Sequence, residues 1–282
     1  MTVIAVDSAS DMDLKMAEEL GVTLVPMQIR IGDEDYLDGV DLSHETFYHK
    51  LIESADLPQT SQINEYRWSE VFAKLTGDGD TVIAITISSK LSGTYSSAVK
   101  AAKAFGGRVL TVDSLNAGPG EHVLVMYAIR LLNEGLPAEE IVLKLNAAKS
   151  RIQLLAVLDT LKYLKKGGRI SSVAAFTGEL LSIKPVISIV KGEVKLIGKA
   201  MGSKKGNNLL MQLADRCGGI DFDMPYCLAY SGLSDTYLQK YLADSERLWK
   251  GKTDDIPVYM LGSTIGTHVG PGAIAVTFFA KE

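Results

Sequence analysis

Residues 81–98 have the sequence TVIAITISSKLSGTYSSA, and the expected fold is built outward from them. Residues 81–87 are β-branched and apolar, which predicts a buried strand, and the apolar residues at 98–105 predict a helix. Ser92 stands at the expected helix N-cap, and Gly93 lets the backbone approach a ligand closely. Because the first amides of a helix are free and its dipole favours negative charge, such a turn can bind an anion. The alternative is that Ser92 only caps the helix.

Strands and helices alternate through about the first 150 residues. We expect strands at residues 3–6, 22–31, 81–87 and 108–112, and helices at 11–20, 44–54, 65–75, 98–105, 120–133 and from Pro137 onward. Ser10, Ser43 and Asn64 are the expected N-caps of the first three of these helices, and the polar residues at 58–62 predict a loop. This alternation predicts an α/β fold with a parallel, Rossmann-like sheet covered by helices on both faces. Ligands of such sheets bind beyond the carboxyl ends of the strands. Asp7-Ser8, the turn at 88–94 and Asp113-Ser114 all follow strands, so we expect them at one edge.

The second half has a different character, which places a domain boundary near residue 152. We expect domains at 1–152 and 153–282. Lys191-Gly192 lies between two β-branched runs and predicts a hairpin. Further strands are expected at 153–158, 226–230, 258–261 and 273–279, with helices at 160–166, 171–181, 204–216 and 234–249. A glycine-rich segment, 262–272, holds Thr264, Thr267 and His268. We interpret His268 as a loop histidine bonded to backbone; the alternative is that its ring lies close to a ligand.

Composition excludes several classes of protein. The net charge is −5 and no basic patch carries interleaved aromatic residues, which argues against a nucleic-acid partner. No apolar run approaches the roughly 18 residues that a membrane span needs. The first residues form a strand-like run with no basic segment before it, so we expect no signal peptide. The only cysteines, Cys217 and Cys227, lack a metal-type spacing, so we interpret them as ordinary thiols. Free thiols are typical of a reducing compartment, and we therefore expect a cytoplasmic protein.

Neither metal nor cofactor motifs are evident. The acidic residues Asp33, Glu34, Asp35, Asp38 and Asp41 lack the spacing of a calcium loop, so we expect a solvated loop. His44 and His49 are five residues apart and do not share a helix face, so surface positions are expected. The chain contains no nucleophile elbow and no phosphate loop, and residues 266–272 do not match a dinucleotide fingerprint.

Two further constellations carry possible chemistry. Ser92, His268 and either Asp7 or Asp113 can be drawn as a catalytic triad, which keeps a serine hydrolase or acyltransferase as an alternative function. Arg169 follows two glycines, which would let its guanidinium approach an anion; the alternative is a solvated helix end.

Several stretches together resemble the DegV family of bacterial fatty-acid-binding proteins. They are DS (7–8) with Asp11, PQTSQ (58–62), SKLSGTY (89–95), DS (113–114), LDTLKYL (158–164) continuing to GGRIS (167–171), KP (184–185) and GTHVGPG (266–272). They run from the first strand to the last, and their order makes the resemblance specific. One departure is Ile63-Asn64, where the family pattern has Pro-Ser.

The resemblance implies two α/β domains, the second with a mixed or largely antiparallel sheet, and one long-chain fatty acid in a tunnel near the domain interface. The implied ligand-binding residues are Thr60, Ser61, Ser92, Gly93, Thr94, Ser114 and His268, with Arg169 contacting either the head group or a kinase. In related proteins a separate fatty acid kinase uses ATP to make the acyl phosphate for phospholipid synthesis. The resemblance thus implies a binding protein without cofactor or metal, not an enzyme. A binding module for another apolar acid or lipid stays open.

Overall fold

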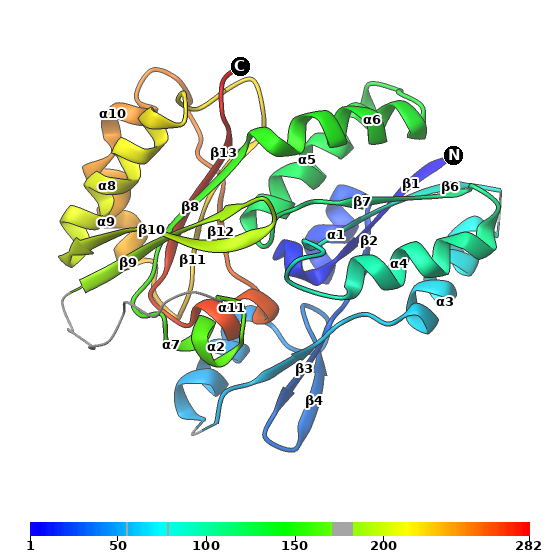
Figure 1. Ribbon diagram of the computed structural model, residues 1–282, viewed down its shortest axis with the longest axis horizontal. Helices are drawn as coiled ribbons and strands as arrows, with labels where there is room; N and C mark the ends of the chain where they lie inside the picture. Colours follow the sequence, from blue (N-terminus) through cyan, green and yellow to red (C-terminus); the bar gives the residue numbers. More distant parts are fainter. Residues whose placement is uncertain (55, 78, 171–182) are drawn as a thin grey trace.

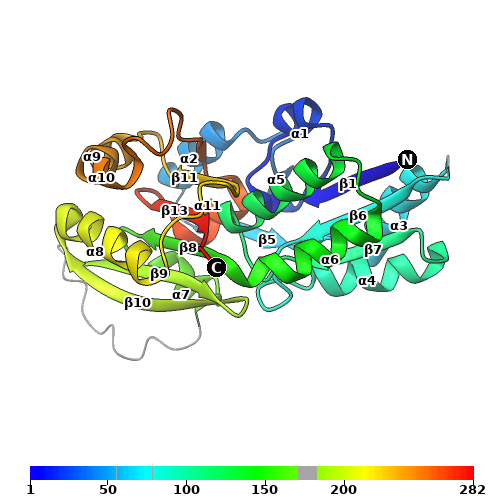
Figure 2. The same ribbon diagram turned by 90° about the horizontal axis from the view of Figure 1, so that it is seen from above.

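The computed structural model describes residues 1–54, 56–77, 79–170 and 183–282. These residues form a two-domain α/β fold with three sheets, and the two larger sheets lie side by side along the long axis (Figures 1 and 2). The helix predicted at 171–181 lies outside the described residues. None of the described helices is both long and apolar enough to cross a membrane.

The first domain is built on a parallel sheet in the order β2-β1-β6-β7. Its strands are β1 (Thr2–Asp7), β2 (Thr23–Val25), β6 (Thr81–Thr86) and β7 (Val109–Asp113). Alternate residues of β1 and β6 face opposite sides, as strand geometry requires. One side packs against α1 (Leu14–Leu20), α5 (Pro119–Asn133) and α6 (Ala138–Ala148), the other against α3 (Glu65–Thr76) and α4 (Thr94–Ala102). The predicted parallel sheet with helices on both faces is confirmed.

The second domain is built on a six-stranded mixed sheet in the order β10-β9-β8-β13-β11-β12. Its strands are β8 (Ile152–Val157), β9 (Ile183–Val190), β10 (Glu193–Met201), β11 (Tyr226–Tyr230), β12 (Val258–Met260) and β13 (Ile274–Phe279). All neighbours are antiparallel except β11 and β12. The β9–β10 hairpin turns at Lys191-Gly192 as predicted. The predicted boundary near residue 152 stays a prediction, although β8 is the first strand of this sheet along the chain.

The two faces of this sheet have different neighbours. One face packs against α8 (Gly202–Arg216), α9 (Thr236–Asp244) and α10 (Glu246–Trp249), using Leu155 and Val157 of β8. The other face carries Leu154 and Ala156 of β8 and turns toward α7 (Lys162–Lys166), α11 (Ser263–Val269) and the first domain. Strand alternation therefore supplies one apolar surface for the domain core and a second one for the space between the domains.

The third sheet was not predicted. It joins β4 (Glu34–Leu37), β3 (Gln28–Ile31) and β5 (Gln59–Ser61) in the order β4-β3-β5, next to α2 (His44–Glu53), which Ser43 caps as expected from the sequence. The single strand predicted at 22–31 was wrong, because Pro26 interrupts it and β2 and β3 belong to different sheets. The loop at 58–62 is in fact largely strand, since Gln59–Ser61 pairs with β3 through its backbone.

Two helix starts also differ from expectation. Residues 8–10 form a 3-10 turn, and α1 begins only at Leu14, where Asp13 rather than Ser10 is the N-cap. Helix α4 begins at Thr94 with Gly93 at the cap position, although the Ser92 hydroxyl does accept the Thr94 amide at 3.3 Å.

The glycine-rich segment 262–272 contains helix α11, contrary to the sequence expectation. Its first amides are held by Asp38, which is fully buried instead of lying in a solvated loop. The Asp38 carboxylate accepts the amides of Ser263 and Thr264 at 3.0 and 3.1 Å and the Thr264 hydroxyl at 2.6 Å. Because this cap comes from more than 200 residues away in the chain, local sequence carries no sign of it.

Candidate functional site

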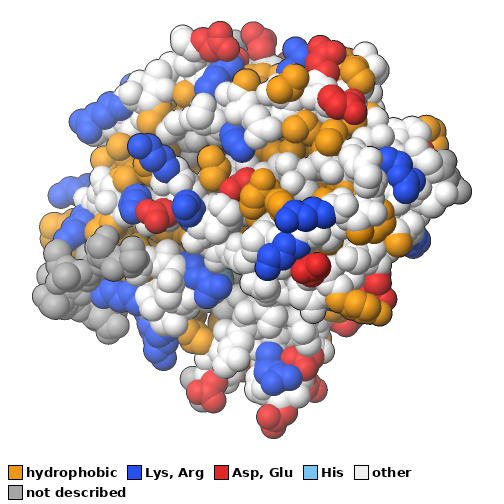
Figure 3. Space-filling view, turned by 45° about the vertical axis from the view of Figure 1, so that its right-hand side comes forward, with side chains coloured by type: hydrophobic (Ala, Val, Ile, Leu, Met, Phe, Trp, Pro, Cys, Tyr) orange, Lys and Arg blue, Asp and Glu red, His pale blue; other side chains and the backbone are white. Residues whose placement is uncertain are grey.

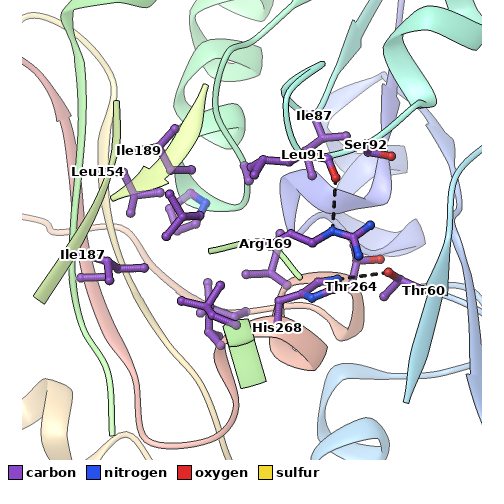
Figure 4. Close-up of a pocket in the computed structure, with 18 of the residues that line it drawn as sticks. Thr60, Ile87, Leu91, Ser92, Leu154, Arg169, Ile187, Ile189, Thr264 and His268 are labelled. Atoms are coloured by element: carbon purple, nitrogen blue, oxygen red, sulfur yellow. Dashed lines mark hydrogen bonds between the residues drawn. The ribbon is translucent and has the colours of Figure 1, made fainter. Parts of the chain in front are cut away.

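An apolar cavity of about 290 Å³, here the inner cavity, lies between the six-stranded sheet and the turn that joins β6 to α4. This volume is close to the lower end of the roughly 300–1,000 Å³ range of ligand pockets. Figure 4 shows aliphatic side chains of β8 and β9 at one end and polar side chains at the other. The apolar lining is Met27, Ile87, Leu91, Ala117, Pro119, Leu154, Ala156, Leu158, Leu164, Ile187, Ile189, Val194, Leu261, Ile265, Val269, Ala273 and Ala275.

The polar end draws on four separate parts of the chain. Thr60 and Ser61 come from β5, Ser92 from the turn before α4, Arg169 from the segment after α7, and His268 from α11. Gln62, Gly93 and Thr264 complete the polar lining. Figure 4 shows Thr60, Arg169, Thr264 and His268 gathered at this end of the cavity. An amphipathic ligand with one polar head and a long apolar tail matches this division.

His268 is a neutral side chain at this end. Its Nε2 lies 3.1 Å from the Thr60 hydroxyl, while its buried Nδ1 has no partner among the described residues. Burial lowers the pKa of His268 to about 4, and the nearby Arg169 charge acts in the same direction. At neutral pH the imidazole is therefore uncharged, and it can donate a hydrogen bond through one ring nitrogen and accept one through the other. Gly167 packs against the ring, since a Cβ there would come within 2.3 Å of Nδ1.

Among the residues that the structure describes, the hydrogen-bond partners of Arg169 are backbone carbonyls. Its Nε donates to the Leu91 carbonyl at 3.3 Å, and one terminal nitrogen donates to the Gly167 carbonyl at 2.6 Å. The guanidinium thus joins the β6–α4 turn of the first domain to the segment after α7 while keeping its full positive charge. Its side chain borders the inner cavity.

The turn before α4 is closely packed. The Ser92 hydroxyl lies 2.9 Å from that of Thr94, whose oxygen also accepts the Ile63 amide at 3.3 Å. Gly93 has a packing role, because a Cβ there would lie 1.9 Å from the Gln62 side-chain oxygen. The sequence predicts that a ligand approaches Gly93 closely; in the structure, the group that approaches Gly93 is the Gln62 side chain.

Six of the residues singled out in the sequence line the inner cavity: Thr60, Ser61, Ser92, Gly93, Arg169 and His268. Thr94 and Ser114 are not among the described lining residues. Both are fully buried, and the Ser114 hydroxyl donates to the Asn116 carbonyl at 3.1 Å. Sequence reasoning missed Gln62 and Thr264, although each lies within a stretch that it had singled out.

The bonds expected of a catalytic triad are not observed among the described residues. In the described contacts, His268 is bonded to the Thr60 hydroxyl, and the Ser92 hydroxyl is bonded to that of Thr94. Asp7 accepts the amides of Ala9 and Ile87 at 2.9 and 2.8 Å, so this carboxylate ties strand β1 to the end of β6. Asp113 accepts the Ser89 and Leu115 amides at 3.1 and 3.0 Å. These carboxylates organise the sheet edge through backbone amides.

Metal chemistry finds no support in the part of the chain that the structure describes. There, no three His, Cys, Asp or Glu side chains are gathered as metal ligands would be. The acidic residues near 33–41 divide between surface ion pairing, as in Arg30 with Asp35 at 2.6 Å, and the buried capping role of Asp38. Figure 3 shows acidic and basic side chains next to one another over the β3–β4 hairpin, at the lower end of the molecule.

The fold and cavity define a two-domain α/β protein with an apolar cavity between its domains. The chain belongs to the DegV family, whose model matches residues 1–281. A DegV domain-containing protein of Caldanaerobacter subterraneus subsp. tengcongensis is 35% identical over 281 residues, covering 99% of this chain and 98% of that protein.

Solved structures agree with the family assignment. A DegV family protein from Thermus thermophilus, described by its fatty acid binding, has a TM-score of 0.87 at 29% identity, with 99% of each chain covered. A stearic-acid-binding protein from Eubacterium ventriosum has a TM-score of 0.85 at 26% identity, covering 98% of this chain and 97% of that one.

Proposed function

We propose that this protein binds one long-chain fatty acid in the inner cavity, with the acyl chain against the six-stranded sheet. The observation that carries the proposal is the division of the cavity into a long aliphatic part and one polar end. Burying about sixteen carbons gains on the order of 12 kcal/mol gross, at roughly 0.8 kcal/mol per methylene, before the ordering costs. The apolar tail therefore supplies the affinity, and the polar end fixes the orientation.

The carboxylate would lie among Thr60, Ser61, Ser92 and His268. A buried carboxylate without partners costs several kcal/mol, so it needs hydrogen-bond donors. The hydroxyl groups and, in one tautomer, the neutral imidazole can donate without forming an ion pair. This arrangement leaves an oxygen of the carboxylate free to react.

We further propose that the protein is cytoplasmic and presents this carboxylate to a separate fatty acid kinase. The kinase would use ATP to phosphorylate the carboxylate, and the resulting acyl phosphate would enter phospholipid synthesis. The protein is then the carrier and not the catalyst. The absence of a Ser92–His268 bond among the described contacts supports a carrier over the serine hydrolase alternative. A head group locked in a bidentate pair with Arg169 in a ligand-bound structure would contradict this arrangement.

The first experiment is mass spectrometry of the lipids that the purified protein releases on denaturation. A stoichiometric long-chain acid is expected, and its identity separates fatty acids from other apolar acids or lipids. Calorimetry with palmitate and oleate gives the affinity, and octanoate is the control that has the same head group but a short tail. A protein that releases no acid and takes up neither long-chain acid would refute the proposal. Labelling of Ser92 by a serine-reactive phosphonate would favour the hydrolase instead.

A further inference from the structure

A second pocket of about 380 Å³, here the outer pocket, adjoins the polar end of the inner cavity. The two share the side chains of Thr60, Arg169 and His268. The rest of the outer lining is Leu57, Pro58, Gln59, Lys166, Gly167 and Thr267. A group attached to the head of a ligand in the inner cavity would therefore enter the outer pocket directly.

The outer pocket is cationic, in a protein whose net charge is −5. Among the residues that the structure describes, its lining contains Lys166 and Arg169 and no aspartate or glutamate. Among the described residues, no ion pair joins either cation to a carboxylate, and the Arg169 guanidinium rests on two carbonyl oxygens. Carbonyl contacts hold a guanidinium in place without neutralising it, and Lys166 lies in the last turn of α7, three residues before Arg169. Two uncompensated cations that border one pocket favour an anion, and a multivalent one above all.

We propose that the outer pocket binds the phosphoryl group of a fatty acyl phosphate, with Lys166 and Arg169 as its cationic contacts. The inference rests on the proposed function, because it takes the acyl phosphate as the product formed at this head group. In that molecule the phosphorus is bonded to a carboxyl oxygen, so the phosphoryl group must lie beside the carboxylate position. The outer pocket is the space there, and its hydroxyl groups on Thr60 and Thr267 can donate further hydrogen bonds.

The division of charge between the two pockets has a chemical consequence. The carboxylate of the free acid meets mainly neutral donors in the inner cavity, whereas the phosphoryl group, with its larger negative charge, meets Lys166 and Arg169. The same tail is thus held more tightly after phosphorylation than before. A carrier with this property retains the reactive product.

The test compares palmitate with a stable palmitoyl phosphate analogue in which CH₂ replaces the bridging oxygen. Both ligands are titrated by calorimetry into the wild-type protein and into Lys166→Gln, which does not alter the inner lining. The matched control is Lys162→Gln, an exposed lysine on the same helix that borders neither pocket. We expect Lys166→Gln to weaken the analogue by about tenfold, to leave palmitate within about twofold, and the control to change neither.

Each other outcome overturns the inference. Equal weakening of both ligands by Lys166→Gln would make the lysine a general stabiliser of the site, and an unchanged affinity for the analogue would remove it from the outer pocket. Titration with ATP alone tests whether the outer pocket binds the phosphate donor instead of the acyl phosphate. Saturable ATP binding that Lys166→Gln abolishes would assign the outer pocket to ATP. Failure of the proposed function is distinguishable, because the wild-type protein would then not bind palmitate at all.

Discussion

Asp38 offers a direct test of how helix α11 is positioned. Its carboxylate is fully buried and accepts three hydrogen bonds from Ser263 and Thr264 at 2.6 to 3.1 Å. Asp38→Ala leaves these donors without an acceptor, which costs about 1–3 kcal/mol of folding free energy for each unsatisfied buried group. Part of this cost is offset because the substitution also removes a buried charge. We therefore expect the free energy of unfolding to fall by about 3–5 kcal/mol. Asp38→Asn keeps one carbonyl oxygen and should cost about 1–2 kcal/mol.

The same change should reach the ligand, because α11 carries Thr264 and His268 into the cavity lining. Urea unfolding gives the stability, and calorimetry with palmitate on folded Asp38→Asn protein gives the affinity, which we expect to fall by about tenfold. The control is Asp33→Asn, which removes an exposed carboxylate nearby and should change stability by no more than about 0.5 kcal/mol. If Asp38→Ala were as stable as Asp33→Asn, the capping argument would be refuted.

Three more predictions follow from the site and its surroundings. Ser92→Ala should weaken palmitate binding by roughly 1–3 kcal/mol, the cost of an under-satisfied buried acceptor. Calorimetry measures this loss, with Ser96→Ala as the control variant. If the two variants bound palmitate with equal affinity, Ser92 would have only a structural role. Under the proposed function, Arg169→Ala should keep palmitate affinity within about threefold but lower kinase-dependent acyl phosphate formation by about tenfold or more, because the proposal places its charge against the phosphoryl group. Equal losses of both would place Arg169 on the carboxylate. Burial raises the pKa of Asp7 from its ordinary 3.8 to about 7, so the unfolded chain ionises first and stability falls by up to about 4 kcal/mol as pH rises from about 4 to 7. In urea unfolding at several pH values, Asp7→Asn should reduce this loss; identical pH profiles would show that Asp7 does not titrate there.

The sequence predicted the elements whose signal is local. Residues 81–87 predicted β6 because β-branched runs bounded by turn residues are typical of buried strands, and Val82–Ile85 is fully buried. Lys191-Gly192 predicted its hairpin through turn chemistry, and Ser43 and Asn64 predicted the starts of α2 and α3 through capping. The sheet edge was also predictable in outline, since Asp7 and Asp113 do meet the backbone next to β6.

The elements that sequence reasoning missed depend on distant partners. Gln59–Ser61 is polar and follows a proline, so nothing local favours a strand, and it becomes one by pairing with β3. Asp38 looked like one acid in a solvated run because only the fold reveals that it caps α11. The triad drawn through Ser92 and His268 lacks its bond among the described contacts for a related reason: residue types suggest a bond, but the backbone decides which groups meet, and His268 meets Thr60.

The buried carboxyl groups of the first domain illustrate the cost that the head group of the proposed ligand would meet. Asp7, Asp11 and Glu121 are fully buried, and burial raises the pKa of each because the interior solvates charge poorly. Under the proposed function, a fatty acid carboxylate in the adjoining cavity would meet the same penalty. A guanidinium clamp would remove the penalty but would also withdraw electron density from the oxygen that attacks a phosphoryl group in the proposed reaction. Hydroxyl groups and a neutral His268 would lower the penalty while preserving nucleophilicity, and Arg169, tied to the carbonyls of Leu91 and Gly167, would stay available for the charge of the phosphoryl group.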